Sequence, residues 1–227
     1  MNNIVDLSFP VSGAQLWADH NHRLLAALSE KCSDIHKLEG LAINTIMGIP
    51  DEEKQGIIKL TSKSRLVLRL PVEAIQNVYL LAGQTLNVGG HRIDLGQPVL
   101  QTIKPADAVK ARLVTIKGYT EPGLFLQAAH RQLQGLEINA NVGITANNKG
   151  EPKRLTLKIT KDIDGKQKSF TIVGFSVVVS DLTPDDSIKL QVNGLGGKRR
   201  LGCGVFFPTV SVYQRQGGDR HATTTIG

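Results

Sequence analysis

The chain has 227 residues, 41% of them hydrophobic, and its 27 lysines and arginines outnumber 20 acidic residues, giving a formal net charge of +7. This composition excludes an intrinsically disordered chain and allows one large domain or two small ones, each with its own core. The presence of only two cysteines excludes both a cysteine zinc site and a disulfide framework.

The positive charge favours an anionic partner, with nucleic acid first and an anionic membrane surface second. Aromatic residues make up only 4% of the chain, which argues against base stacking on an aromatic sheet surface as the main way of holding RNA. The N-terminal segment shows no secretory signal, and no apolar run reaches the length of a membrane span. We therefore expect a cytoplasmic protein with no membrane partner.

Hydrophobic periodicity predicts the order β-α-β-β-α-β over residues 1–97. Asp19 is expected to cap the first helix, in which Leu24 and Leu28 form the core face. The expected elements are a strand at 4–10, a helix at 20–31, strands at 41–47 and 64–70, a helix at 72–82, and either a strand pair or one long bent strand at 85–95 around Gly89-Gly90. A polar stretch is expected at 51–55, between the second and third strands.

The same order recurs in the remainder of the chain, residues 98–227. The expected elements are a strand at 111–117, a helix at 122–133, strands at 136–142 and 155–160, a hairpin turn at Asp164-Gly165, a return strand at 169–180, a helix at 184–192, a last strand at 205–212, and a polar tail from Gln214. Two such halves predict an α+β fold of two tandem ferredoxin-like, or RRM-like, domains at 1–97 and 98–227.

The segment from Gly194 to Gly204 lies between the last expected helix and the last expected strand. It contains five glycines, Gly194, Gly196, Gly197, Gly202 and Gly204, around the three consecutive cations Lys198, Arg199 and Arg200. Cations framed by glycines suit contact with a phosphate backbone. The spacing fits neither a Walker A loop nor a dinucleotide fingerprint, because Arg199 follows Gly197-Lys198 and because a strand follows the segment.

The segment resembles the C-terminal signature of the RAMP superfamily of CRISPR proteins, which is G-h-G, five residues including Lys or Arg, and G-x-G. Further blocks strengthen the resemblance: VDLSFPVSG, ADHNHRLLAALS, SRLVLRLP, LAGQTLNVGG, ARLVTIKG and GLGGKRRLGCGVFFP. Together they are similar to the CRISPR repeat-processing endoribonuclease, the sixth CRISPR-associated family, in its MYXAN subtype. The resemblance spans nearly the whole chain and agrees with the tandem ferredoxin-like order.

The resemblance implies metal-independent cleavage of precursor CRISPR RNA inside each repeat, with no cofactor. In the family, the ribose 2′-OH attacks the adjacent phosphorus, expels the 5′-oxygen, and leaves a 2′,3′-cyclic phosphate. Such a reaction needs a base, an acid and cations near the phosphorane. The sequence shows no compact Asp, Glu and His set with metal-ligand spacing, so a two-metal nuclease is not predicted.

Three histidines, His20, His22 and His36, lie near the first helix. By the resemblance, His36 occupies the loop position where many family members carry the general base, with a glycine, here Gly40, a few residues later. His20 lies in the predicted first turn, where the helix dipole favours a neutral imidazole. We expect His36 to act as base or acid and His20 to be its partner or replacement; which of them is the base stays open. His22 is expected to be exposed, and surface or structural roles are expected for His91, His130 and His221.

Two groups of cations are expected to contact RNA. Lys198, Arg199 and Arg200, with the five motif glycines, would hold the repeat stem or its flanking strand. Ser64, Arg65 and Arg69, on the non-leucine face of their strand, would contact phosphates near the scissile one, unless that face is simply solvated. Both groups are expected to border one cleft between the domains.

Two alternatives remain at this point. The chain could be a non-catalytic guide-RNA-binding subunit of a CRISPR effector complex, since the same fold and glycine segment would serve that role. It could also be a general RRM-like RNA-binding protein, although neither expected central strand carries the aromatic RNP motif. The expected partners are precursor and mature CRISPR RNA, and other subunits of a type I effector complex.

Overall fold

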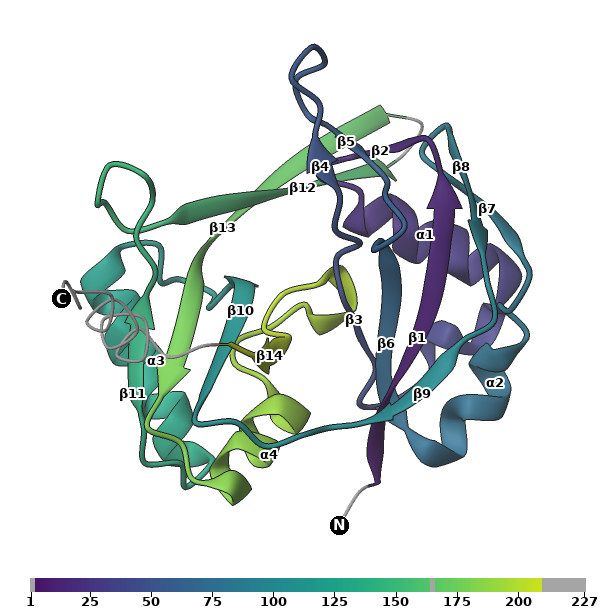
Figure 1. Ribbon diagram of the computed structural model, residues 1–227. Coiled ribbons are helices and arrows are strands. Elements are labelled where there is room, and N and C mark those ends of the chain that lie inside the picture. The colour runs from purple at the N-terminus through teal and green to yellow at the C-terminus, as the bar shows by residue number, and fades with distance from the viewer. Residues whose placement is uncertain (1–2, 164–165, 210–227) are drawn as a thin grey trace, which may run out of the picture.

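The computed structural model describes residues 3–163 and 166–209. The fold is mixed α+β, with two main antiparallel sheets that belong to the two halves of the chain and lie side by side, and a small third sheet (Figure 1). Within the residues so described, no helix is long and apolar enough to cross a membrane.

The N-terminal half is built around β1, which pairs with three other strands. The main sheet has the order β3-β6-β1-β8-β7, β9 also pairs with β1, and β2, β5 and β4 form a separate small sheet. The elements are β1 (Ile4–Gly13), β2 (Gln15–Trp17), α1 (Asn21–Lys31), η1 (Ser33–His36), β3 (Ala42–Ile43), β4 (Ile49–Pro50), β5 (Ile57–Lys59), β6 (Arg65–Pro71), η2 (Val72–Ala74), α2 (Ile75–Tyr79), β7 (Thr85–Val88), β8 (His91–Leu95) and β9 (Val99–Thr102).

The C-terminal half has the strand order β11-β13-β10-β14, with β12 paired to β13. Its elements are β10 (Ala108–Val114), α3 (Pro122–Gly135), β11 (Asn141–Ile144), β12 (Arg154–Ile163), β13 (Lys166–Ser180), α4 (Pro184–Asn193), η3 (Arg199–Leu201) and β14 (Phe206–Pro208). The expected turn at Asp164-Gly165, the end of the last expected strand, and the polar tail lie outside the described residues.

Each half has its own hydrophobic core. In the N-terminal half, the alternation of β6 buries Leu66, Leu68 and Leu70, as expected, and β1 places Phe9 opposite Leu66. The apolar side of α1 packs against this sheet through Leu24 and other buried residues. The periodicity of these segments was therefore sufficient to predict their inward faces.

The largest departure from the expected elements is the segment predicted as a strand at 41–47. Only Ala42–Ile43 forms a strand, because side chains bind the backbone that follows. The Ile46 amide donates to the ring of His20, and the Met47 carbonyl accepts from the hydroxyl of Ser64. These contacts satisfy the backbone without a neighbouring strand.

Two smaller departures concern the helices of this half. The helix expected at 72–82 divides into η2 and the short α2, whereas the polar stretch at 51–55 lies between strands as expected, in the turn between β4 and β5. The N-cap of α1 is His20, without a side-chain cap, whereas Asp19 accepts a hydrogen bond from the backbone amide of Lys158 at 2.5 Å. Asp19 therefore joins the β12–β13 hairpin, which extends over to the N-terminal half (Figure 1), to the start of α1.

Candidate functional site

The glycine-rich segment links α4 to β14 and lies between the two halves of the molecule (Figure 1). It is fastened to the start of α1 by Asn21, whose Nδ2 donates to the Leu201 carbonyl and to Thr45 Oγ1, both at 2.7 Å. Asn21 is buried. Sequence reasoning missed this residue, because a polar side chain in a first helical turn carries no local sign of a partner 180 residues away.

The glycines of this segment serve mainly the packing of the protein against itself. At Gly202, which has a φ of +77°, a Cβ would overlap the side chains of Asn21 and Thr45, and at Gly196 it would overlap the Thr115 carbonyl. Gly194 and Gly204 are similarly crowded by protein backbone, whereas Gly197 has open space around it. Of the five glycines expected to contact RNA, Gly197 is thus the one that the fold leaves open to a second molecule.

The three cations of the segment lie in different environments. Lys198 is exposed and Arg199 is half-buried. Arg199 Nε and Nη2 are buried and have no hydrogen-bond partner among the residues described, and burial, with a smaller contribution from Arg69, lowers the pKa of this guanidinium to about 10. Arg200 Nη2 donates to the Leu38 carbonyl at 2.7 Å. Lys198 is therefore the most accessible of the three cations, whereas Arg199 and Arg200 are both half-buried.

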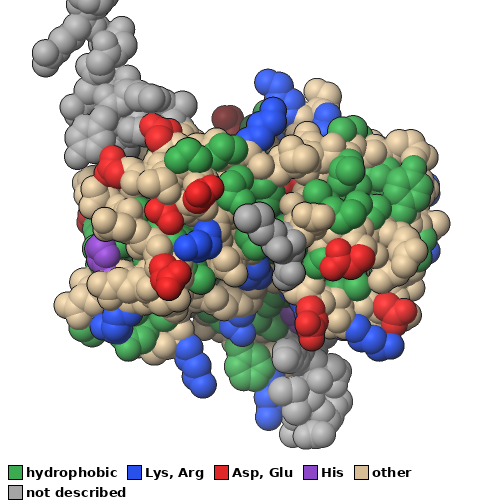
Figure 2. Space-filling model, turned by 90° about the horizontal axis from the view of Figure 1, so that it is seen from below, with side chains coloured by type: hydrophobic (Ala, Val, Ile, Leu, Met, Phe, Trp, Pro, Cys, Tyr) green, Lys and Arg blue, Asp and Glu red, His purple; other side chains and the backbone are tan. Residues whose placement is uncertain are grey.

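Positive charge is not concentrated on the face of the molecule that is seen from below. Seen from below, lysine and arginine side chains are interspersed with aspartate and glutamate over both halves (Figure 2). The net charge of +7 therefore does not form one continuous basic surface on this side.

Arg69 does not have the position expected of an RNA contact. It is 1% exposed, and it forms a two-bond ion pair with Asp6 at 2.7 and 2.8 Å. Its Nη1 donates to the carbonyls of Gln191 and Phe206, both at 2.8 Å, and its guanidinium lies 4.7 Å from the ring of Phe207. Arg69 therefore ties β6 to α4 and β14, and has no surface left for a phosphate.

Ser64 and Arg65, which were expected to contact RNA together with Arg69, differ from each other in exposure. Ser64 is fully buried, and its hydroxyl donates to Met47 and accepts from the Thr61 amide, so it cannot contact RNA. Arg65 is exposed, but its Nη1 donates to the carbonyls of Ser62 and Ser64 at 2.7 and 2.8 Å. The expectation of RNA contact is therefore wrong for Ser64 and Arg69 and stays a prediction for Arg65.

His20 is fully buried, and both of its ring nitrogens are engaged. Nδ1 lies 2.7 Å from the Trp17 carbonyl, and Nε2 accepts from the Ile46 amide at 3.2 Å, which defines a neutral imidazole protonated at Nδ1. Burial lowers the pKa of His20 to about 4. The expected neutral form is present, but burial is its main cause, and the geometry suits a structural role better than proton transfer.

His36 is exposed at the end of η1, which is anchored by the buried Ile35. The Leu38 carbonyl, two residues further along the chain, is the one that Arg200 binds. A cation of the glycine segment is therefore bound to the backbone two residues from the candidate base, although Arg200 and His36 are 164 residues apart in sequence. His20 and His36 flank opposite ends of the eleven-residue α1, about 16 Å long, so they do not form a pair.

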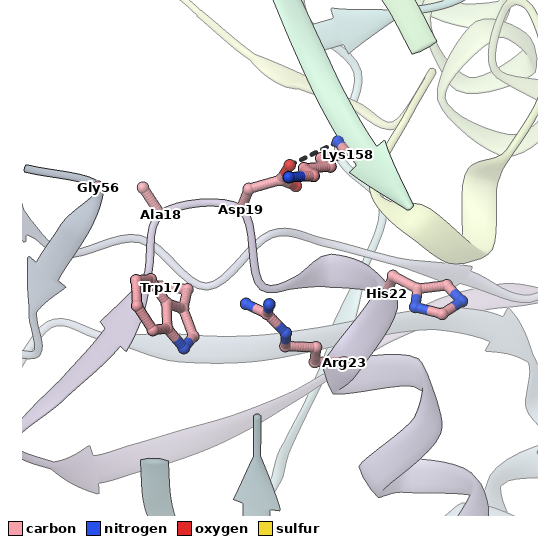
Figure 3. Close-up of a pocket in the computed structure, with 7 residues that line it drawn as sticks. All are labelled: Trp17, Ala18, Asp19, His22, Arg23, Gly56 and Lys158. Carbon is pink, nitrogen blue, oxygen red and sulfur yellow. Dashed lines mark hydrogen bonds between the residues drawn. The ribbon is translucent and has the colours of Figure 1, made fainter. Parts of the chain in front are cut away.

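Three other histidines lie in the part of the chain that the structure describes. His22 lines a cavity at the start of α1 (Figure 3), His91 packs edge-on against Trp17, and His130 is exposed on α3. His221 lies outside the described residues. In the part of the chain that the structure describes, no group of three or more His, Cys, Asp or Glu side chains is placed to hold a metal ion.

Comparison with known proteins relates this arrangement to a family. The family described as Cas6 Crispr matches residues 5–211. The chain belongs to the Cas6 family. It is 30% identical over 204 residues to the CRISPR-associated endonuclease Cas6 of Myxococcus xanthus (strain DK1622), an alignment that covers 90% of this chain and 81% of that protein. The predicted family and the predicted enzyme class, a CRISPR-associated endonuclease, are confirmed.

Solved structures of Cas6 and RAMP proteins have the same fold. A CRISPR-associated protein Cas6 is similar with a TM-score of 0.58 and 12% identity, over 91% of this chain and 99% of that chain. A Cas6-related protein from Pyrococcus furiosus has a TM-score of 0.55 and 12% identity, over 90% and 98% of the chains. A RAMP protein described as binding different RNA substrates has a TM-score of 0.51 and 12% identity, over 89% and 98%.

Proposed function

We propose that this Cas6 chain is a metal-independent endoribonuclease that cleaves precursor CRISPR RNA within its repeats. The observation that carries the proposal is the contact between Arg200 and the Leu38 carbonyl, which fixes a cation of the glycine segment to the backbone two residues from the exposed His36. A phosphoryl-transfer site needs a proton-transferring group and fixed positive charge at the same place.

In the proposed reaction, the ribose 2′-oxygen loses its proton and attacks the adjacent phosphorus in line with the 5′-oxygen. The bond from phosphorus to the 5′-oxygen breaks, and the products are a 2′,3′-cyclic phosphate and a 5′-hydroxyl. His36 is the proposed proton-transferring group: it takes the proton from the 2′-oxygen as base or gives a proton to the 5′-oxygen as acid, and water exchanges the other proton. Arg200 and Lys198 stabilise the charge on the phosphorane, and Lys198 and Gly197 hold the RNA backbone.

The fold supports a division into two ferredoxin-like domains. In each half, four core strands can be numbered first to fourth along the chain. They lie in the sheet in the order second, third, first, fourth: β3-β6-β1-β8 in the N-terminal half and β11-β13-β10-β14 in the C-terminal half. Because β9 pairs with β1, we place the boundary between Thr102 and Ala108, later than residue 97. RNA would then contact the glycine segment where the two domains meet.

The test is cleavage of the repeat RNA encoded beside the gene, in the presence of EDTA, with mapping of the product ends. We expect cutting within the repeat, a cyclic phosphate end, and no cutting when the nucleotide at the cleaved bond is 2′-deoxy. Strict metal dependence, or normal cutting of the deoxy substrate, would contradict the mechanism. His36→Ala is expected to lower the rate about 10²- to 10⁴-fold.

His130→Ala is the matched control, because His130 is an exposed histidine on α3, away from the segment that Arg200 binds. It should cleave like the parent protein. If His36→Ala also retains normal cleavage, the assignment of His36 fails. If the parent protein binds repeat RNA tightly and never cuts it, a non-catalytic guide-RNA-binding role replaces the proposed activity. Assembly with type I effector subunits stays a prediction.

A further inference from the structure

A cavity of about 380 Å³ opens at the start of α1, within the range of small-ligand pockets, about 300 to 1,000 Å³. Its lining joins both halves of the molecule, since Gly56 comes from the β4–β5 turn and Lys158 from β12. The rest of the lining is Trp17, Ala18, Asp19, His22 and Arg23 (Figure 3). Neither the proposed chemistry nor the glycine segment uses this cavity.

The aromatic side chain of this cavity is exposed but held firmly. Trp17 is 38% exposed, its Nε1 donates to the Gly89 carbonyl at 3.1 Å, and the ring of His91 packs edge-on at 5.5 Å. The Arg23 guanidinium lies 5.3 Å from the indole centroid, and the Arg23 side chain extends toward Trp17 (Figure 3). An exposed, oriented indole with a guanidinium over it is a surface on which a flat ring stacks.

The charges of the cavity favour an anion beside that ring. Arg23 and Lys158 supply two cations and Asp19 one carboxylate, and one oxygen of Asp19 is already bonded to the Lys158 amide. Asn21, which lies between Asp19 and Arg23 in sequence, bonds to the Leu201 carbonyl, so the first turn of α1 connects the lining of the cavity to the glycine segment.

We propose that this cavity binds one unpaired nucleotide of the RNA substrate. The base stacks on the Trp17–Arg23 pair, and its phosphate is held by Arg23 and Lys158. The ligand class, RNA, rests on the proposed function; the stacking geometry comes from the cavity itself. Low aromatic content made such stacking unexpected, but a single preformed position needs only one indole.

The experiment uses the fluorescence of Trp17, the only tryptophan of the chain. The full-length protein is titrated with repeat RNA carrying a 2′-deoxy group at the cleavage site, and with a series in which unpaired nucleotides are made abasic one at a time. We expect saturable quenching with the intact RNA. One abasic position should abolish the quenching and weaken the Kd about tenfold.

Variants provide a second measurement by gel shift. Trp17→Leu and Arg23→Gln should each weaken the binding of repeat RNA about tenfold. The abasic position that weakens the Kd of the parent protein should have no further effect on the Kd of either variant. Arg92→Gln is the matched control, because the Arg92 side chain is 76% exposed on β8 and does not line the cavity. A thermal melt shows whether each variant is folded under the conditions of the assay.

The outcomes separate this proposal from the proposed function. If repeat RNA is cut normally but Trp17 fluorescence does not respond and Trp17→Leu binds like the parent protein, the nucleotide site is wrong and the nuclease stands. If quenching depends on one base but no RNA is cut, the site stands and the nuclease fails. Quenching that persists with every abasic RNA shows phosphate contact without stacking and overturns the proposal.

Discussion

The most informative single perturbation of this protein is Arg69→Met. Methionine is unbranched and uncharged, so the substitution removes the donors while filling the space of the arginine's aliphatic stem. It breaks the two-bond ion pair with Asp6, whose side chain is 10% exposed, and removes the donor to the Gln191 and Phe206 carbonyls. The substitution therefore leaves a buried carboxylate and two buried carbonyls without their partner.

The expected loss of folding stability comes mainly from the Asp6 carboxylate, which is left buried without its partner. Removing one member of a buried ion pair costs about 3 to 5 kcal/mol, whereas replacing both members by nonpolar side chains costs much less. We therefore expect Arg69→Met to lower the free energy of unfolding by about 3 to 5 kcal/mol, and Asp6→Leu to lower it by a similar amount. The double variant should lose well under the sum of the two, because neither charge is then left alone.

The assay is urea unfolding followed by Trp17 fluorescence and by far-UV circular dichroism. Arg65→Gln is the control on the same strand, since Arg65 is exposed; it should lose less than about 1 kcal/mol. A loss below about 1 kcal/mol for Arg69→Met, or strict additivity in the double variant, would refute the reasoning. Weaker RNA binding by Arg69→Met with unchanged stability would restore the expectation that Arg69 contacts RNA.

Three further outcomes follow from the site. His20 has a pKa of about 4 in the folded protein and 6.5 when unfolded, so the unfolded chain binds more protons between these pH values. The free energy of unfolding should therefore fall by about 3 kcal/mol as the pH drops from 6.5 to 4. In urea titrations, His20→Gln should flatten this dependence on pH. Burial raises the pKa of Cys203 to about 11 and also raises that of Cys32, so Ellman's reagent should react with both thiols only after denaturation. Lys198→Gln should weaken RNA binding and reduce the salt slope of log K by about one, measured by filter binding at several salt concentrations.

Local sequence patterns predicted the main helices and the inward faces of the strands, but not the short strands β2, β4, β5 and β9. The alternation at 64–70 identified Leu66, Leu68 and Leu70 as core residues, and the pattern of glycines and cations identified the segment from Gly194 to Gly204. Such patterns succeed because they depend on repeats of two or about four residues, which are local properties of the backbone. The family resemblance rested on the same local blocks.

The sequence by itself thus determined the two-halved α+β order, the family and the position of the glycine segment. The tertiary structure alone decided which polar residues remain available. Arg69 lies on the face of its strand that periodicity predicts to be solvated, yet α4 and β14, more than 120 residues away, cover it. His20 is buried by contacts with segments before and after it, while Asn21 and Trp17 acquire their roles from partners distant in sequence. Periodicity indicates which side of an element a residue occupies; only the packing of other elements decides whether that side meets water, protein or RNA.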